Sequence, residues 1–375
     1  METFQQFKKY VQSASDRKTR EKRIRKFIRD RKLAKGFPII ENELVTFIYL
    51  GEVKNKISIS GCFNDWHRET DFLQNIEGTN LYYKSMNFAT DARIEYAFIK
   101  DEELIIDPFN KRQGFGGLGA YSELRMPEYT PPTTIKYSEE IPHGTTEAFR
   151  FKSKILCNNR IIHVYLPPGY SPEEEYPAIF AQDGSDYLRF GYFDNVLDNL
   201  IEKHKIMKVI GIFIDPDNRL LEYDLNNKYI AFLVNEVVPF VDDTYTTKST
   251  PSSRLVMGAS FGGLISCYAA LLHPHIFGKV ASQSGYLSRN DDWIINEFKA
   301  NPRKSVNFYL DCGIYEKNVG GIYGDFTIGN RKMRDILKAK GYKFTYKEFS
   351  EGHNWGNWRS RISAILMTFF GDSRA

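Results

Sequence analysis

The sequence predicts an α/β protein in two parts, a small β-sandwich followed by a larger domain in which helices enclose a mainly parallel sheet. Three observations predict this fold class. Short β-rich segments separated by turn residues occupy the chain from residue 36 to about residue 126. After residue 141, apolar strands alternate with longer amphipathic segments, which is typical of parallel strands connected by helices. The length of 375 residues is sufficient for two domains.

The composition is that of a globular protein. Hydrophobic residues make up 42% of the chain and charged residues 26%, which excludes disorder, collagen and coiled coil as descriptions of the whole. No apolar run of about 18 residues occurs, so we expect no membrane span. The first residues lack the features of a secretion signal, so we expect a cytoplasmic protein; a mature chain whose signal was removed is the alternative.

The four cysteines give no indication of a metal site. They are Cys62, Cys157, Cys267 and Cys312, far apart in the sequence and without a C-x-x-C pair. Buried thiols are therefore expected, and no zinc site.

Residues 1–35 form a basic segment ahead of the first domain. Residues 17–35 contain eleven Lys and Arg and two acidic residues, a local charge of +9. Since the whole chain has a formal charge of +4, the remainder carries −5. Ile24, Phe27 and Ile28 lie at helical spacing and predict a helix with one narrow apolar stripe. We favour a solvated helix that packs this stripe on the next domain over contact with nucleic acid or another anionic surface, because no recognition module accompanies the charge.

Residues 36–140 are predicted to form the β-sandwich. The expected strands are Val45 to Leu50, Ile57 to Ser60, Leu81 to Phe88 and Arg93 to Lys100. Two segments with strong turn chemistry separate or follow them, Gly61-Cys62-Phe63-Asn64-Asp65-Trp66 and Asp107-Pro108-Phe109-Asn110. The G-x-G-x-x-G at 114–119 opens no predicted helix, so we interpret it as a loop and not as a dinucleotide site. A proline-containing stretch at 126–132 is the expected linker.

Residues 141–375 are predicted to form the larger α/β domain. Its candidate strands are Ile161 to Leu166, Ala178 to Gln182, Val209 to Ile214, Leu255 to Met257, Lys279 to Ser282, Val306 to Asp311 and Phe344 to Phe349. Helical patterns intervene, including residues 228–241 and 331–340.

The most informative motif of this domain is G-x-S-x-G, formed by Gly258, Ser260 and Gly262. A predicted strand precedes it and a predicted helix follows. A nucleophilic serine in an α/β-hydrolase fold lies on such a strained turn, where bulky neighbours would collide with the backbone. The motif therefore predicts an α/β-hydrolase fold with Ser260 as nucleophile.

Two backbone N–H groups are candidates to hold the oxyanion that forms when Ser260 attacks a carbonyl. Phe261 begins the helix, whose dipole favours negative charge at that end. Ser185 follows the strand that ends near Gln182, and Gly184 before it permits a tight turn. An ordinary Asp-Gly turn is the alternative interpretation of this second segment.

A serine nucleophile requires a base and an acid, which in this fold follow in the order serine, acid, histidine. His353 lies on a loop after the last strand and before the final helix, where the base is expected; the other six histidines do not fit this position. Two acids remain open. We favour Glu316, just beyond the end of a strand, over Asp311 at its last position, because a side chain there can point into the sheet.

These motifs resemble a known family. Gly258 to Leu264, Phe277 to Gly285 and Gly352 to Trp355 are similar to segments of the esterase D-like α/β hydrolases, and within them to the enterochelin esterases. Residues 63–66 and 107–110 resemble the immunoglobulin-like, early-set N-terminal domain of those esterases. The resemblance implies a serine esterase that hydrolyses a catecholate trilactone and releases its iron, with no metal or organic cofactor of its own.

A ferric tris-catecholate substrate carries a charge of about −3, so its pocket should present cations and aromatic rings. Asp183 and Gly184 are candidate substrate-binding residues near the predicted site. Of the cationic and aromatic candidates Arg189, Arg219, Lys317, Trp355 and Trp358, we expect about half to line the pocket. Two other functions stay open. One is a carbohydrate esterase acting on feruloylated or acetylated sugars, and the other is a non-catalytic glycan-binding protein with a relic hydrolase domain.

Overall fold

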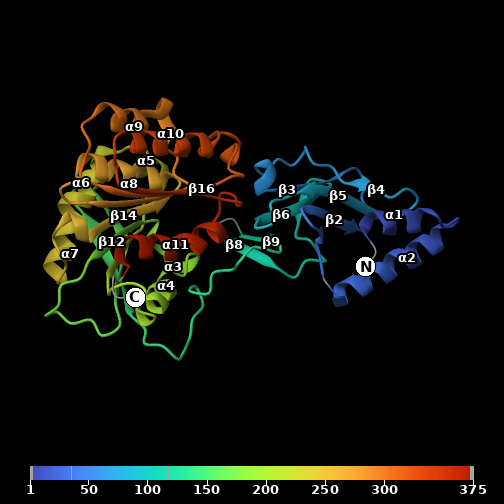
Figure 1. The fold of residues 1–375 in the computed structure, drawn as a ribbon, viewed down its shortest axis with the longest axis horizontal. Helices are drawn as coiled ribbons and strands as arrows, with labels where there is room; N and C mark the ends of the chain where they lie inside the picture. The colour runs from blue at the N-terminus through green and yellow to red at the C-terminus, as the bar shows by residue number, and fades with distance from the viewer. Residues whose placement is uncertain (1–2, 35, 117–118, 372–375) are drawn as a thin grey trace. The chain divides into compact units, whose positions relative to one another are not determined.

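The computed structural model describes residues 3–34, 36–116 and 119–371, and the chain divides into two compact units (Figure 1). Unit 1 comprises Met1–Thr130, Ile314–Gly324 and Ser350–His353, and unit 2 comprises Pro131–Gly313, Asp325–Phe349 and Asn354–Ala375. The predicted boundaries at residues 35/36 and 140/141 differ from this division. The basic segment is part of unit 1, the chain enters unit 2 at Pro131, and two later segments return to unit 1.

Unit 1 is built mainly from short antiparallel strands. Its elements are α1 (Phe4–Gln12), α2 (Arg17–Ala34), β1 (Ile39–Glu41), β2 (Leu44–Leu50), β3 (Ile57–Gly61), η1 (Cys62–Asn64), β4 (Gln74–Asn75), β5 (Leu81–Asn87), β6 (Arg93–Lys100), β7 (Glu103–Ile105), β8 (Gln113–Gly116), β9 (Gly119–Arg125) and η4 (Val319–Gly321). The four strands that the sequence predicted are confirmed within a residue at each end. The motif at 114–119 was expected as a loop, but its described residues lie in β8 and at the first position of β9; Gly117 and Leu118 lie outside the described residues.

Two antiparallel sheets share the core of unit 1. One has the strand order β1-β2-β5-β4, and the other has β3-β6-β9-β8 with β7 paired to β6. Apolar side chains from both sheets, among them Phe47, Ile59, Tyr96 and Leu124, meet in one buried cluster. Alternation along β2 and β3 places these side chains on the inner faces. The predicted sandwich is therefore present.

The basic helix packs its apolar stripe on this sandwich. Ile24 and Ile28 of α2 are buried in a second cluster with Ile48 and Leu81 of the strands. The Phe27 ring stacks on Phe7 of α1 with centroids 3.7 Å apart. The charged positions around the stripe stay in contact with solvent, as predicted for a solvated helix.

Unit 2 contains one large sheet between helices. Its elements are β10 (Thr145–Ser153), β11 (Asn158–Leu166), β12 (Ala178–Gln182), α3 (Gly184–Arg189), α4 (Phe193–Glu202), β13 (Ile210–Ile214), α5 (Arg219–Tyr223), α6 (Asn227–Phe232), the π-helical turn η2 (Leu233–Val237), α7 (Val238–Thr244), η3 (Pro251–Ser253), β14 (Arg254–Ala259), α8 (Phe261–Leu272), β15 (Lys279–Gln283), α9 (Arg289–Ala300), β16 (Asn307–Gly313), α10 (Phe326–Ala339), β17 (Phe344–Phe349) and α11 (Trp355–Phe370).

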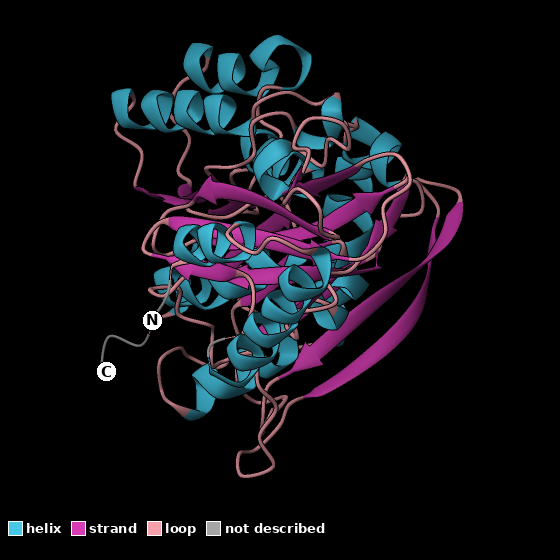
Figure 2. Cartoon of the chain, turned by 90° about the vertical axis from the view of Figure 1, so that its right-hand side faces the viewer, coloured by secondary structure: helices cyan, strands magenta, loops and turns pink. Residues whose placement is uncertain are grey.

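The sheet of unit 2 has eight strands in the order β10-β11-β13-β12-β14-β15-β16-β17. The neighbouring strands from β13 to β17 in this order are parallel. β11 pairs in the antiparallel sense with both of its neighbours, β10 and β13. Helices cover both faces of the sheet, as Figure 2 shows in cyan. Residues of α3, α4 and α11 form one large core cluster with the central strands. The mainly parallel α/β domain predicted from the sequence is confirmed.

One strand of this sheet was not predicted. β10 is exposed along most of its length, because it is the edge strand and turns polar residues such as Glu147 and Lys152 outward. Central strands β12, β13 and β14 are buried at every position, which is why their apolar runs were readable. The exposure of β10 thus explains why it was not predicted, and the burial of the central strands explains why they were.

Candidate active site

Ser260 lies on a sharp turn between a buried strand and a helix of unit 2. β14 ends at Ala259 and α8 begins at Phe261, so the strand, serine and helix follow in the predicted order. Ser260 has φ 59° and ψ −122°, a conformation that costs free energy for a residue with a side chain. Its N–H donates to Gln283 O at 2.9 Å, and its carbonyl accepts from Leu264 N at 3.1 Å. These bonds hold the strained turn in place.

The glycines around Ser260 are required by close packing. A Cβ atom on Gly258 would lie 2.5 Å from the backbone of Gly262, and one on Gly263 would lie 2.4 Å from Ser282 Oγ. Backbone atoms cannot move aside without unfolding the turn, so position 258 has no space for a side chain. The G-x-S-x-G spacing therefore has a steric cause in this structure.

The two predicted oxyanion donors have different surroundings. Phe261 is the first residue of the twelve-residue helix α8, where the helix dipole favours an anion. The Ser185 N–H instead donates to Asp215 Oδ1 at 2.6 Å, and the Ser185 hydroxyl also bonds Asp215 and lies 3.0 Å from His163 Nε2. An oxyanion at Ser185 would therefore have to take the place of the Asp215 carboxylate.

Asp215 is held in its charged form. Burial acts to raise the pKa of Asp215, but hydrogen bonds from His163 and Ser185 outweigh burial, and the pKa lies below its usual value. His163 is one of the six histidines that do not fit the position of the base. The structure places it in this polar cluster at the start of α3.

Arg219, a predicted substrate cation, is paired with another predicted site residue. Its Nε donates to Asp183 Oδ1 and its Nη2 to Asp183 Oδ2, both at 2.8 Å, and Nη2 also lies 3.2 Å from the carbonyl of Ala259. Burial acts to lower the pKa of Arg219, but attraction to Asp183 outweighs it and raises the pKa. The guanidinium thus joins the loop after β12 to the residue that precedes Ser260.

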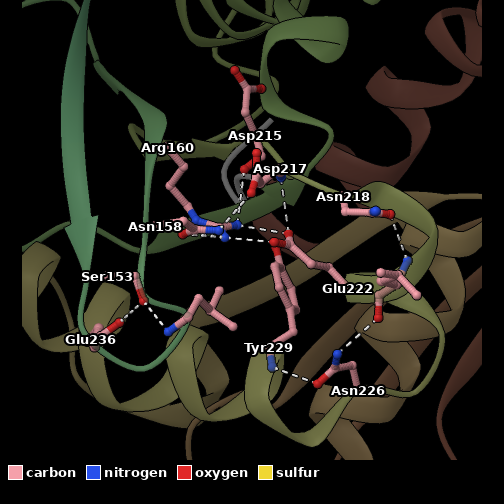
Figure 3. Close-up of polar contacts among 12 residues, drawn as sticks. Ser153, Asn158, Arg160, Asp215, Asp217, Asn218, Glu222, Asn226, Tyr229 and Glu236 are labelled. Atoms are coloured by element: carbon pink, nitrogen blue, oxygen red, sulfur yellow. Dashed lines mark hydrogen bonds and ion pairs between the residues drawn. The ribbon is translucent and has the colours of Figure 1, made fainter.

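Helix α5 carries two more residues that support this region and to which the sequence analysis assigned no role, Glu222 and Tyr223. The Tyr223 hydroxyl accepts a hydrogen bond from Asp183 N at 3.0 Å. Glu222 accepts two bonds from Arg160, at 2.8 and 2.9 Å, and Figure 3 shows this buried pair beside the Tyr229 ring. The signal available in the sequence was Arg160, a charged residue directly before the apolar residues Ile161 and Ile162, since a buried charge requires a partner.

The predicted base and acid are joined within unit 1. His353 Nδ1 lies 3.0 Å from Glu316 Oε2, and the Glu316 side chain is fully buried while His353 keeps 18% of its side chain exposed. A carboxylate at Nδ1 fixes the imidazole tautomer that leaves Nε2 able to accept a proton.

Asp311, the other candidate acid, has a different partner. It lies within β16 and binds Arg361 of α11, with Arg361 Nη1 2.8 Å from Asp311 Oδ1 and neither side chain exposed. This geometry agrees with the expectation that a carboxylate at the strand end points into the domain.

Several predicted substrate-binding residues have packing roles. Trp355 and Trp358 are 8% and 7% exposed and belong to the core cluster under α11, and Trp358 Nε1 donates to Ser284 Oγ at 3.0 Å. Gly184 packs so tightly that a Cβ there would lie 2.3 Å from the backbone of β13. At these three positions most of the residue surface contacts protein, and a role in substrate binding stays a prediction. Arg189 and Lys317 are exposed.

The described residues offer no preformed metal centre. Within 3–34, 36–116 and 119–371, no group of three or more His, Cys, Asp or Glu is arranged to hold a metal ion. None of the helices in those ranges is long and apolar enough to cross a membrane.

The fold and the serine turn define an α/β hydrolase-type esterase. Residues 153–369 match the protein family described as "Putative esterase", which covers more than half of the chain. The chain belongs to this family, and it is a carboxylic ester hydrolase.

Three similar proteins show the range of the likeness. "Uncharacterized protein YjcH" of Bacillus subtilis is 32% identical over 235 residues, which cover 60% of this chain and 97% of that protein. The enterobactin esterase of Shigella flexneri, solved in the presence of enterobactin, superposes with a TM-score of 0.73 at 23% identity and covers 88% of this chain and 94% of that one. A ferulic acid esterase of Anaeromyces mucronatus superposes with a TM-score of 0.54 at 20% identity, over 64% of this chain and 96% of that one.

Proposed function

We propose that the protein hydrolyses esters through a catalytic triad of Ser260, His353 and Glu316. The observation that carries this proposal is the bond of 3.0 Å between His353 Nδ1 and the buried Glu316 carboxylate, found in a chain that also holds Ser260 on a strained strand-to-helix turn. Acyl transfer by a serine enzyme requires a nucleophile, here Ser260, and a histidine base oriented by a carboxylate, here His353 with Glu316.

The order of the strands supports the assignment. β14, β16 and β17 run parallel in one sheet, so their carboxyl ends lie at the same edge. Ser260 directly follows β14, and the segments that carry Glu316 and His353 directly follow β16 and β17. Functional residues of open α/β sheets collect at this edge.

In the proposed reaction, Ser260 Oγ attacks the ester carbonyl carbon while His353 Nε2 accepts the hydroxyl proton. Glu316 stabilises the imidazolium and keeps its orientation. The N–H groups of Phe261 and Ser185 hold the oxyanion. The Ser185 N–H can do so only after its hydrogen bond to Asp215 has broken. The tetrahedral intermediate then expels the alcohol, which takes the proton from His353. Water repeats these steps on the acyl-enzyme and regenerates the serine.

We propose a ferric catecholate trilactone of the enterobactin type as the substrate, with iron release as the consequence. The likeness to an enterobactin esterase solved with enterobactin extends over 88% of this chain, and so includes more than the esterase domain. The sandwich of unit 1 is then an immunoglobulin-like domain of early-set type. Exposed Arg189 and Lys317 are the candidate cations for a substrate of about −3 charge, since Arg219 is neutralised by Asp183.

The test compares the wild-type protein with Ser260→Ala on ferric enterobactin, with linear dihydroxybenzoyl-serine products followed by mass spectrometry. Products from the wild type and a loss of at least about 10³-fold in Ser260→Ala would support both the triad and the substrate. Equal rates for the two proteins would refute the nucleophile. Hydrolysis of p-nitrophenyl butyrate without hydrolysis of the trilactone would refute the substrate alone.

A second candidate is hydrolysis of feruloyl or acetyl esters of sugars. The superposition with a ferulic acid esterase at a TM-score of 0.54 favours it. Methyl ferulate and acetylated xylan, assayed with the same two proteins, distinguish this function. A fluorophosphonate that labels the wild type but not Ser260→Ala would exclude a relic hydrolase.

A further inference from the structure

The segments 314–324 and 350–353, which carry the proposed acid and base, belong to unit 1, although the strands before them belong to unit 2. Within unit 1 they contact the sandwich directly. The N–H of Arg93, the first residue of β6, donates to Ser350 O at 3.1 Å. A backbone hydrogen bond thus joins the second segment to the first residue of β6, three residues before His353.

The two segments are also bound to each other and to the sandwich core. The Tyr315 N–H donates to Glu351 O at 3.2 Å, so the segment with the acid and the segment with the base are joined by backbone one residue from Glu316. The Tyr315 ring packs edge-on against Phe88, with centroids 6.1 Å apart, and lies on the apolar core of the sandwich.

A strained turn of the sandwich forms the rest of this support. It is the segment Gly61 to Trp66, which the sequence marks as turn chemistry without a function. Asp65 and Trp66 have φ of 53° and 62°, values that residues with side chains rarely adopt. The Asn64 side chain accepts from Gly61 N at 2.9 Å and donates to Asp71 Oδ2 at 2.8 Å. Residues held in such conformations cluster at functional sites, which motivates the question of what this turn contacts.

This turn contacts both segments. Asp65 Oδ1 accepts a hydrogen bond from Asn318 N at 2.9 Å, two residues beyond Glu316. Cys62 lies against Gly352, the residue before His353, so closely that a Cβ on Gly352 would lie 2.3 Å from Cys62 Cβ and 2.8 Å from its Sγ. The turn therefore meets the acid segment by a hydrogen bond and the base segment by direct packing.

We propose that the turn from Cys62 to Asp65 positions the catalytic pair, with Cys62 setting the place of His353 and Asp65 that of Glu316. The proposal rests on the proposed function. It assigns the N-terminal sandwich a role in the catalytic step, in addition to any contact with substrate. Because a displacement of about 1 Å in a catalytic group costs about 10²-fold in rate, such support acts on kcat more than on KM.

The first experiment exchanges space between Cys62 and Gly352. Gly352→Ala should lower kcat on p-nitrophenyl butyrate by about 10- to 100-fold, because the new Cβ has to displace the residue beside His353. Cys62→Gly removes the atoms in its way. The double variant should therefore recover most of the lost kcat, whereas independent effects would add. A double variant as slow as Gly352→Ala, or a Gly352→Ala with wild-type kcat, would overturn the role of Cys62.

The second experiment uses Asp65→Ala with Asp101→Ala as its matched control. Asp101 also accepts backbone bonds in the sandwich, from Lys54 and Asn55 at 3.2 and 2.8 Å, but those residues lie far from the catalytic pair in sequence. Both variants should lower the melting temperature. Only Asp65→Ala should lower kcat and the rate of fluorophosphonate labelling, with KM changed by less than about threefold. Equal kcat losses in both variants would reduce Asp65 to a structural role.

Ser260→Ala, assayed beside these variants, separates the two hypotheses. If Ser260→Ala is inactive while Gly352→Ala and Asp65→Ala hydrolyse as the wild type does, the triad stands and the positioning role fails. If Ser260→Ala hydrolyses at the wild-type rate, the proposed function fails, whatever the other variants do.

Discussion

The two halves of the proposed triad are held in different ways. Ser260 is fixed by its own neighbours in the sequence, because Gly258 and Gly262 pack backbone on backbone and the flanking strand and helix are buried. His353 and Glu316 lie on loop segments whose fixed contacts come from residues about 250 to 290 positions earlier, such as Cys62 and Asp65. The proposed nucleophile is held by residues close to it in the sequence, whereas the proposed base and acid are held by tertiary contacts.

This difference predicts where the enzyme tolerates change. A local turn fails when a single added atom collides with backbone, since nothing else can move. A pair held by side chains of another segment fails when its support is removed, even with both catalytic groups present. The predictions below test the two halves separately.

The largest effect is expected at the acid. Glu316→Gln keeps the size of the buried side chain but cannot stabilise the imidazolium, so kcat should fall by roughly 10²–10⁴-fold with a folded protein. Steady-state kinetics and a thermal melt measure both quantities.

Asp311→Asn is the matched control for Glu316→Gln. Asp311 pairs with Arg361 in a site closed to solvent, and removing one charge of such a pair costs about 3–5 kcal/mol of stability. The folded fraction should retain nearly normal kcat. The reverse pattern, a fast Glu316→Gln and a slow Asp311→Asn, would transfer the acid role to Asp311.

The next effect is expected at the nucleophile turn. Gly258→Ala places a Cβ 2.5 Å from the Gly262 backbone, whereas Gly262→Ala places one 3.2 Å from the end of the Asp183 side chain. The first should lower activity by at least about 100-fold and the second far less, since a side chain can yield. Fluorophosphonate labelling of equal amounts of folded protein gives the comparison. Equal losses would show that the turn is not limited by backbone contact.

A smaller effect is expected at the clamp between Asp183 and Arg219. Arg219→Gln leaves the buried Asp183 carboxylate unpaired and loosens its link to Ala259, so we expect kcat to fall about tenfold. Arg219→Lys should lower kcat by a smaller factor. The ammonium keeps the positive charge but cannot form the bidentate bond to Asp183. In a double-mutant cycle with Asp183→Asn the losses should be less than additive. If the variants raise KM without lowering kcat, and if their effects on kcat/KM are additive, Arg219 returns to the substrate-binding role that the sequence suggested.

The sequence predicted the parts of this molecule that depend on local pattern. The apolar runs of β12 to β17 and the G-x-S-x-G turn were readable because burial and sterics act within a few residues. Trp355 and Trp358 were predicted to contact substrate because catechol rings favour aromatic partners, and the sequence alone does not show that both side chains are largely buried. Their burial depends on α3 and α4, more than 150 positions earlier.

The sequence also could not predict which residues contact each other over long distances along the chain. From the sequence, Arg219 is simply a positively charged residue. Only the fold shows that Asp183 forms an ion pair with it. The return of residues 314–324 and 350–353 to unit 1 has no sequence signal, because these segments follow ordinary strands of the larger sheet. Long-range contacts of this kind are set by topology and not by composition.

A second histidine–carboxylate pair gives the smallest and most discriminating effect. His143 Nδ1 lies 2.8 Å from Asp198 Oδ2 in unit 2, with Asp194 nearby. The hydrogen bond to Asp198 raises the pKa of His143, so the folded state binds the proton more tightly than the unfolded state. The resulting stability is complete below the unfolded pKa of about 6.5 and is lost as pH rises through the folded pKa.

His143→Gln should therefore lower the melting temperature by about 1–2 °C at pH 5.5 and by less at pH 9, because the pair is partly exposed. Its kcat should stay at the wild-type value at both pH values, since the distance of 2.8 Å alone does not make a histidine catalytic. A kcat loss comparable to that of Glu316→Gln would show that the two pairs cannot be distinguished by their place in the chain, and the contrast between a structural and a catalytic pair would fail.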